Sequence, residues 1–189
     1  MVDLKKVARA TRLLLEGIGE DPNRPGLKDT PRRVARMWRE LVDGMGKKAE
    51  EIVTIIPVED YDEIILLRNI PFVSVCEHHL VPFIGRAHVA YLPTKGRVTG
   101  LSKLARVVEM EARKLQVQER LTNAIAEDIT RTLQPRGIMV VIEAEHLCMT
   151  IRGAHKPGTV TVTSVVRGLF RQKAASRAEA LMLLVGNRP

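Results

Sequence analysis

The chain has 189 residues, of which 45% are hydrophobic and 28% charged, and its formal net charge is +8. This composition suits one globular domain with a sizeable core, and no apolar run reaches the ~20 residues of a membrane-spanning helix. The positive charge indicates an anionic partner, but aromatic residues make up only 3%, so base-stacking platforms are scarce. A phosphorylated small molecule therefore competes with nucleic acid as the expected partner, and a membrane role is not indicated.

The chain begins MVDLKK, without the apolar stretch and cleavage site of a secretory signal. We therefore expect a cytoplasmic protein. In reducing surroundings a structural disulfide between the two cysteines is disfavoured, and a metal site or a catalytic pair is favoured instead.

The N-terminal part, residues 1–50, is expected to be a helical region. Apolar residues recur at spacings of three and four from Leu4 to Ile18, which predicts the first helix. Thr30 followed by Pro31 predicts the start of the second, with the hydroxyl at the N-cap and the proline at N1.

Residues 51–189 are expected to form the main domain, which is rich in strands. Helices are predicted at residues 102–115 and 119–133, and a capping box at Ser176 to Glu179 predicts the start of a last helix. Segments rich in β-branched residues predict strands at 64–67, 70–75, 85–92, 137–145, 147–151 and 159–166. This order indicates an α+β fold with an antiparallel sheet packed against paired helices.

Both cysteines and three of the five histidines fall in two short segments, CEHH and HLC. Thiolate and imidazole are ligands that Zn²⁺ prefers, and a catalytic zinc takes three protein ligands and leaves a position for water. Cys76, His79 and Cys148 can supply the three ligands, which leaves His78 and His146 as free imidazoles for proton transfer near neutral pH. The spacing alone does not decide which of the adjacent histidines binds the metal.

Residues two apart in a strand share a face, so His146 and Cys148 are expected to point the same way. Other interpretations stay open on the residues alone. The cysteines could form a disulfide or be buried as small hydrophobic residues. A basic nucleic-acid-binding protein with a structural zinc would need four ligands, and a zinc nucleobase deaminase would need Pro-Cys-x-x-Cys and His-x-Glu segments, which the sequence lacks.

Four motifs in the same order resemble the GTP cyclohydrolase I family, of the type with a Cys/His zinc site. The resemblance covers nearly the whole chain, from the segment TPRRVA at residue 30 to the C-terminal helix. The motifs are SVCEHH at 74–79, GLSK at 100–103, QVQERLT at 116–122 and EHLCM at 145–149, the last running into Arg152-Gly153.

The resemblance implies an enzyme that adds water to C8 of GTP, opens the imidazole ring, releases formate and forms 7,8-dihydroneopterin triphosphate, a precursor in pterin and tetrahydrofolate biosynthesis. It implies Zn²⁺ as the cofactor, with Cys76, His79 and Cys148 as its ligands. His146 would exchange protons with the attacking water or the ribose, and His78 is the candidate acid at the purine ring.

For substrate binding, the resemblance implies that Glu119 reads guanine. A carboxylate accepts hydrogen bonds from both N1–H and the 2-amino group, a pair that adenine lacks. Gln118 would assist through its backbone or amide. The residues implied on the phosphate and ribose side are Ser102, Lys103, Arg106, Arg152, Arg33 and Arg36; the family usually has Lys at the position of Arg36.

The resemblance also implies the tunnelling fold, in which antiparallel sheets of several subunits join side by side, with residues 51–189 as the catalytic domain. It implies a homodecamer of two stacked pentamers with its sites at subunit boundaries. Other tunnelling-fold enzymes, such as a nitrile reductase or a pterin aldolase, lack this pairing of Cys-x-x-His with His-x-Cys. His88 and His155 match no site position, and we expect them to be structural.

Overall fold

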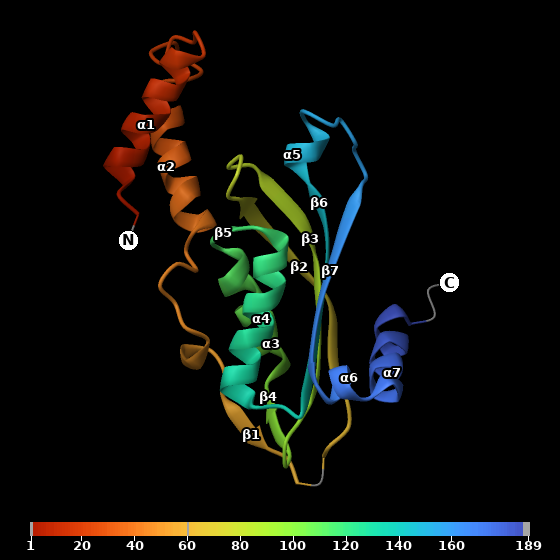
Figure 1. Ribbon diagram of the computed structural model, residues 1–189. Helices are drawn as coiled ribbons and strands as arrows, with labels where there is room; N and C mark the ends of the chain where they lie inside the picture. Colours follow the sequence, from red (N-terminus) through yellow and green to blue (C-terminus); the bar gives the residue numbers. More distant parts are fainter. Residues whose placement is uncertain (1, 60, 187–189) are drawn as a thin grey trace. The chain divides into compact units, whose positions relative to one another are not determined.

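The structure is a computed structural model that describes residues 2–59 and 61–186, and it divides between Asp43 and Gly44 into two compact units. The first unit is a pair of helices, α1 (Leu4–Gly17) and α2 (Thr30–Leu41), which lie side by side (Figure 1). Both predicted helices are therefore present. The domain boundary at residues 50 and 51 stays a prediction.

The two helices begin in different ways. The Asp3 carboxylate accepts from the Lys6 N–H at 2.9 Å and caps α1. Asp29 occupies the N-cap position of α2, so the prediction that Thr30 is the N-cap was wrong by one residue. Pro31 still lies in the first turn, where its missing N–H leaves no intrahelical bond unmade.

The second unit is built on a five-stranded sheet with the strand order β5-β2-β3-β6-β7, in which only the β5–β2 pair is parallel. A short 3-10 helix and a two-stranded ribbon of β1 and β4 precede the helices of this unit. The strands are β1 (Ile55–Pro57), β2 (Ile65–Cys76), β3 (Pro82–Leu92), β4 (Arg97–Thr99), β5 (Leu115–Gln116), β6 (Gly137–His146) and β7 (Val160–Gly168).

Helices cover both faces of this sheet (Figure 1). Alternate residues of β6 point to opposite faces: Val140 and Ile142 pack with the larger core under α3 and α4, whereas Met139 packs with the smaller core under α6 and α7. The helices are α3 (Leu101–Ala112), α4 (Gln118–Leu133), α5 (Leu147–Thr150), α6 (Leu169–Gln172) and α7 (Ala174–Val185). The predicted α+β class, with an antiparallel sheet packed against paired helices, is confirmed.

Other details of the predicted elements were also wrong. The strands predicted at 64–67 and 70–75 are one strand, β2, whose register shifts between Leu67 and Ile70 because Asn69 adopts the left-handed conformation with φ 60°. The last helix begins at Ala174, so Ser176 lies inside it and does not cap it.

The strand predicted at 147–151 is the short helix α5. Here the Glu145 carboxylate accepts hydrogen bonds from the Thr150 hydroxyl at 3.0 Å and from the Gly158 N–H at 2.8 Å. These bonds hold the chain in a turn as it leaves the sheet, and the alternation of residue types does not reveal them.

Across residues 2–59 and 61–186, every helix is too short or too polar to cross a bilayer.

Gly85 of β3 is expected to be essential for the packing of β3 on β6. A Cβ at this position would overlap the Glu143 carbonyl oxygen and lie 2.7 Å from the Ala144 Cβ. Gly85→Ala should therefore lower the free energy of unfolding by about 1–3 kcal/mol in a denaturant titration. Gly17→Ala is the matched control, because no atom lies within 4 Å of the added Cβ; equal stability losses in both variants would contradict the prediction.

Candidate metal and catalytic site

The end of β2 and the turn after it position two of the predicted ligands. Cys76 is the last residue of β2 and is buried, and its carbonyl accepts from the Leu80 N–H at 2.8 Å. The Cys76 N–H donates to the Val81 carbonyl at 2.9 Å, which closes the turn, and Leu80 adopts a positive φ of 56°. This turn brings His79 back beside Cys76.

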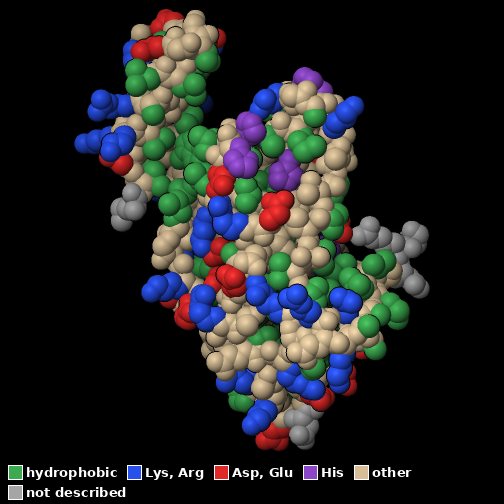
Figure 2. Space-filling view, in the orientation of Figure 1, with side chains coloured by type: hydrophobic (Ala, Val, Ile, Leu, Met, Phe, Trp, Pro, Cys, Tyr) green, Lys and Arg blue, Asp and Glu red, His purple; other side chains and the backbone are tan. Residues whose placement is uncertain are grey.

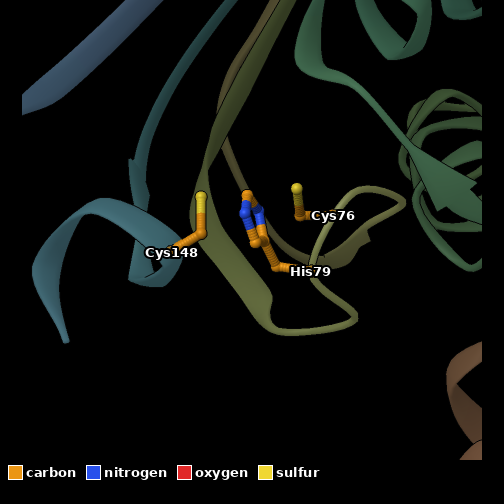
Figure 3. Close-up of side chains that lie close together, drawn as sticks. All are labelled: Cys76, His79 and Cys148. Atoms are coloured by element: carbon orange, nitrogen blue, oxygen red, sulfur yellow. The ribbon is translucent and has the colours of Figure 1, made fainter. Parts of the chain in front are cut away.

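Cys148 completes a cluster of three side chains. It comes from α5, and its Sγ, the Cys76 Sγ and a ring nitrogen of His79 lie within 4.8 Å of one another. Figure 3 shows the three side chains next to one another, two from the end of β2 and the turn after it and one from α5. The structure therefore brings together the three residues predicted as metal ligands.

The chemistry of these donors fits a metal ion. Both cysteines are free, so the described chain has no disulfide at this place. Burial raises the pKa of the Cys148 thiol. The nearby Cys76 raises it further, because two thiolate charges would lie close together. A bound cation removes this penalty and favours the thiolates that coordinate it.

An ion pair anchors the turn that carries His79. The Glu77 carboxylate accepts a hydrogen bond from the Arg120 guanidinium, which lowers the pKa of Glu77. Arg120 also donates to the Gln116 side-chain oxygen and to the Leu115 carbonyl, both at 2.9 Å. The start of α4 thus fixes the first residue of the turn.

His146 lies at the end of β6, next to the predicted metal ligands. Its ring stacks on Phe83, with centroids 4.7 Å apart and an angle of 4° between the planes. Its Nε2 is 2.7 Å from the Gln118 side-chain oxygen. Burial lowers the pKa of His146, while the charge of Glu119 opposes this shift. The expectation that His146 and Cys148 share one strand face was wrong, because the strand ends between them.

His78 remains outside the cluster. Its ring is exposed, its centroid is 6.3 Å from that of His79, and its Nε2 is 4.0 Å from a Glu77 carboxylate oxygen. Histidine side chains gather on the surface at this end of the second unit (Figure 2). His78 is thus accessible to a substrate.

The two residues predicted to bind the guanine begin α4 but have different surroundings. Glu119 is exposed, whereas Gln118 is 2% exposed and its side-chain amide contacts protein groups on all sides. Arg152 follows α5 in an exposed segment, and its charge acts on Cys148. Arg33 and Arg36 are exposed on α2 of the first unit. The roles of all five in GTP binding stay predictions.

The predicted phosphate-binding residues of α3 lie in the half of this helix that is away from the predicted metal ligands of the same chain. Ser102, Lys103 and Arg106 are in the first half of α3, which begins beside β4 (Figure 1). The helix ends just before β5, and β5 pairs with the end of β2 that carries Cys76. A helix of 12 residues is roughly 18 Å long, so its two ends are that far apart.

Sequence reasoning missed the supports of the site. Arg120 is in the first turn of α4 and contacts Gln116, the last residue of β5, but nothing in the sequence links Arg120 to Glu77. The stacking of Phe83 on His146 follows from the register of β3 and β6, which pairs the two residues.

Comparison with known proteins identifies the family. The model of the GTP cyclohydrolase I family matches residues 7–185. The chain belongs to this family. A GTP cyclohydrolase 1 of Pelotomaculum thermopropionicum is 58% identical over 98% of this chain and 99% of its own length. The enzymes of the same name from Carboxydothermus hydrogenoformans and Bacillus subtilis are each 56% identical, over 100% and 95% of this chain and 98% and 95% of their own lengths.

The metal site yields a direct prediction. Cys148→Ser should lose most of the bound metal, since a site with three ligands that is reduced to two holds a cation poorly. Metal analysis of purified protein by mass spectrometry measures this. His155→Ala is the control, because its side chain lies outside the ligand cluster and should leave the metal content unchanged. Full metal retention in Cys148→Ser would remove this residue from the site.

Proposed function

We propose that the GTP cyclohydrolase I activity of this chain depends on one Zn²⁺ ion held by Cys76, His79 and Cys148. The observation that carries the proposal is the convergence of these three donors within 4.8 Å, next to His146, in a chain of this family. The described part of the chain contributes three such donors to the cluster, which fits a catalytic site with an open position rather than a closed structural site.

In the proposed reaction, water adds to C8 of GTP, formate leaves and 7,8-dihydroneopterin triphosphate forms. A bound Zn²⁺ supplies a Lewis acid that makes water nucleophilic near neutral pH. His78 donates a proton to N7 of the purine as C8 is attacked, and its exposed position allows this contact. His146 exchanges protons with the attacking water or, later, with the ribose oxygens.

Glu119 is proposed to select guanine. It is exposed at the first turn of α4, next to Gln118, and its charge acts on His146, so it lies at the same end of the sheet as the metal ligands. Its carboxylate would accept from N1–H and the 2-amino group of guanine. With adenine the desolvated carboxylate would lose these partners, at a cost of about 1–3 kcal/mol.

The triphosphate is proposed to bind the basic residues, some of them from a second chain. Within one chain, the start of α3 with Ser102 and Lys103 lies roughly 18 Å from the end that adjoins the metal ligands. A site shared between neighbouring subunits brings Ser102, Lys103 and Arg106 of one chain to the GTP bound at the zinc of another. Arg152, Arg33 and Arg36 are proposed to complete the phosphate and ribose contacts.

The edge of the sheet supports this assembly. β7 is an edge strand, and Val160 and Val162 on it are 54% and 61% exposed. An apolar edge strand with unpaired backbone groups is stabilised by pairing with another chain. We propose a homo-oligomer, a decamer of two stacked pentamers, in the cytoplasm, where the free thiols stay reduced.

The free histidines should be separable from the metal ligands by mutation. His78→Ala and His146→Ala should each retain one zinc per chain but lose about 10²–10⁴-fold in GTP turnover, because proton-transfer groups contribute this much. Metal analysis together with release of formate and of an oxidised, fluorescent pterin measures both effects. If His78→Ala loses zinc while His79→Ala retains it, the assignment of ligand and acid is reversed.

Glu119→Gln should lower kcat/KM for GTP by about 100-fold, because it places a donor against the guanine N–H groups and leaves a desolvated polar group without a partner. Glu127→Gln on the same helix is the matched control, since Glu127 is exposed and bonds to Asn123 instead. Steady-state kinetics with GTP measure kcat/KM for both variants. A variant at Glu119 with the kinetics of the unaltered enzyme would show that another group reads the base.

Mixed oligomers should show whether the site is shared. Lys103→Ala and His146→Ala are each expected to be inactive alone. After coexpression with different affinity tags, oligomers that contain both chains should regain activity, since roughly a quarter of the sites combine two intact halves by chance. Mixed oligomers as inactive as both parents would place Lys103 and His146 in the site of one and the same chain.

A further inference from the structure

The side-chain amide of Gln118 has a determined orientation. Its nitrogen lies 3.1 Å from the Ile142 carbonyl oxygen, 3.0 Å from the Thr161 carbonyl oxygen and 3.1 Å from the Thr163 hydroxyl. The two carbonyl oxygens only accept hydrogen bonds, so the NH₂ group must face them. The amide oxygen is then the atom that faces His146, at 2.7 Å.

Two neighbouring threonine hydroxyl groups favour this same orientation of the Gln118 side-chain amide. Thr122 Oγ1 donates to the Gln118 backbone carbonyl at 2.7 Å and lies 2.7 Å from Thr163 Oγ1. The Thr163 hydroxyl can therefore donate to Thr122 and accept from the Gln118 amide nitrogen. Every donor in this group of hydrogen bonds has an acceptor. If the Gln118 amide were reversed, its oxygen would face two carbonyl oxygens.

This orientation fixes the tautomer of His146. The Gln118 amide oxygen only accepts, so His146 Nε2 must carry a hydrogen. In the neutral ring Nδ1 then has the free lone pair. Phe83, which is fully buried, stacks parallel to the ring at 4.7 Å and restricts the imidazole to this plane.

We propose that Gln118 is a positioning residue that acts through His146: its amide oxygen keeps the hydrogen on Nε2 and thereby makes Nδ1 the nitrogen that accepts the proton during catalysis. This inference rests on the proposed role of His146 in proton transfer. It assigns to the side chain of Gln118 a role different from contact with GTP, because both ends of the amide bind protein groups.

The first test uses the unaltered, zinc-loaded enzyme labelled with ¹⁵N at histidine. Ring nitrogens with and without hydrogen resonate far apart, and solid-state NMR of sedimented protein resolves them. The His146 signals are assigned by their absence in His146→Asn. A neutral ring with hydrogen on Nε2 is the expected result. Hydrogen on Nδ1 overturns the proposal, and this measurement needs no variant of Gln118.

The second test compares Gln118→Met with Ile129→Val, a buried change in the same helix that reduces packing without touching His146. Gln118→Met should give a mixture of His146 tautomers and should lower kcat by about 10- to 100-fold, because a misplaced proton acceptor loses most of its contribution. KM for GTP should change by less than about threefold, since the side chain does not touch the substrate. Ile129→Val should keep one tautomer and kcat within about twofold, as expected for a change that leaves the proton acceptor in place.

The contrary results are distinct. A raised KM with unchanged kcat in Gln118→Met would show that the amide binds GTP, and unchanged His146 signals in this variant would show that another group holds the ring. If His146→Ala keeps full turnover, the proposed role of His146 in catalysis is wrong. The NMR measurement tests the tautomer of His146 separately from that role.

Discussion

The site depends on the register between three neighbouring strands. On one side of β3, its residue Pro82 pairs with Val75 of β2. On the other side, its residue Phe83 pairs with His146 of β6. Because side chains alternate along a strand, a slip of one residue in either pair would turn a ligand or its support to the other face. The buried cores above and below the sheet make such a slip costly, since both faces are packed.

The groups proposed to meet the substrate or the metal rest on supporting side chains. His78, His79 and Glu119 are exposed, while Gln118 behind them is buried and bonds to His146. Arg120, which is itself exposed, holds the turn of His78 and His79 through Glu77. Gln118 has its side-chain hydrogen bonds satisfied within the protein, so it does not need to reorganise when a substrate arrives.

The sequence predicted which three side chains come together, Cys76, His79 and Cys148, because cysteines and histidines are few in this chain and gather in two segments. It also predicted the long helices and strands, whose periodicity extends over several turns or residues. It failed at α5, where the Glu145 carboxylate decides the local structure through hydrogen bonds to residues further along. It could not place α3, because the direction of this helix depends on the parallel pairing of β5 with Val75 and Cys76.

The same Glu145 oxygen binds Thr150 before the exposed segment that follows α5 and Gly158 after it. Both ends of this segment are therefore tied to one atom at the edge of the sheet, and the residues between them are exposed. Exposed segments whose ends are fixed tolerate changes in length. Over evolution, this segment can therefore gain or lose residues while Cys148 stays in place.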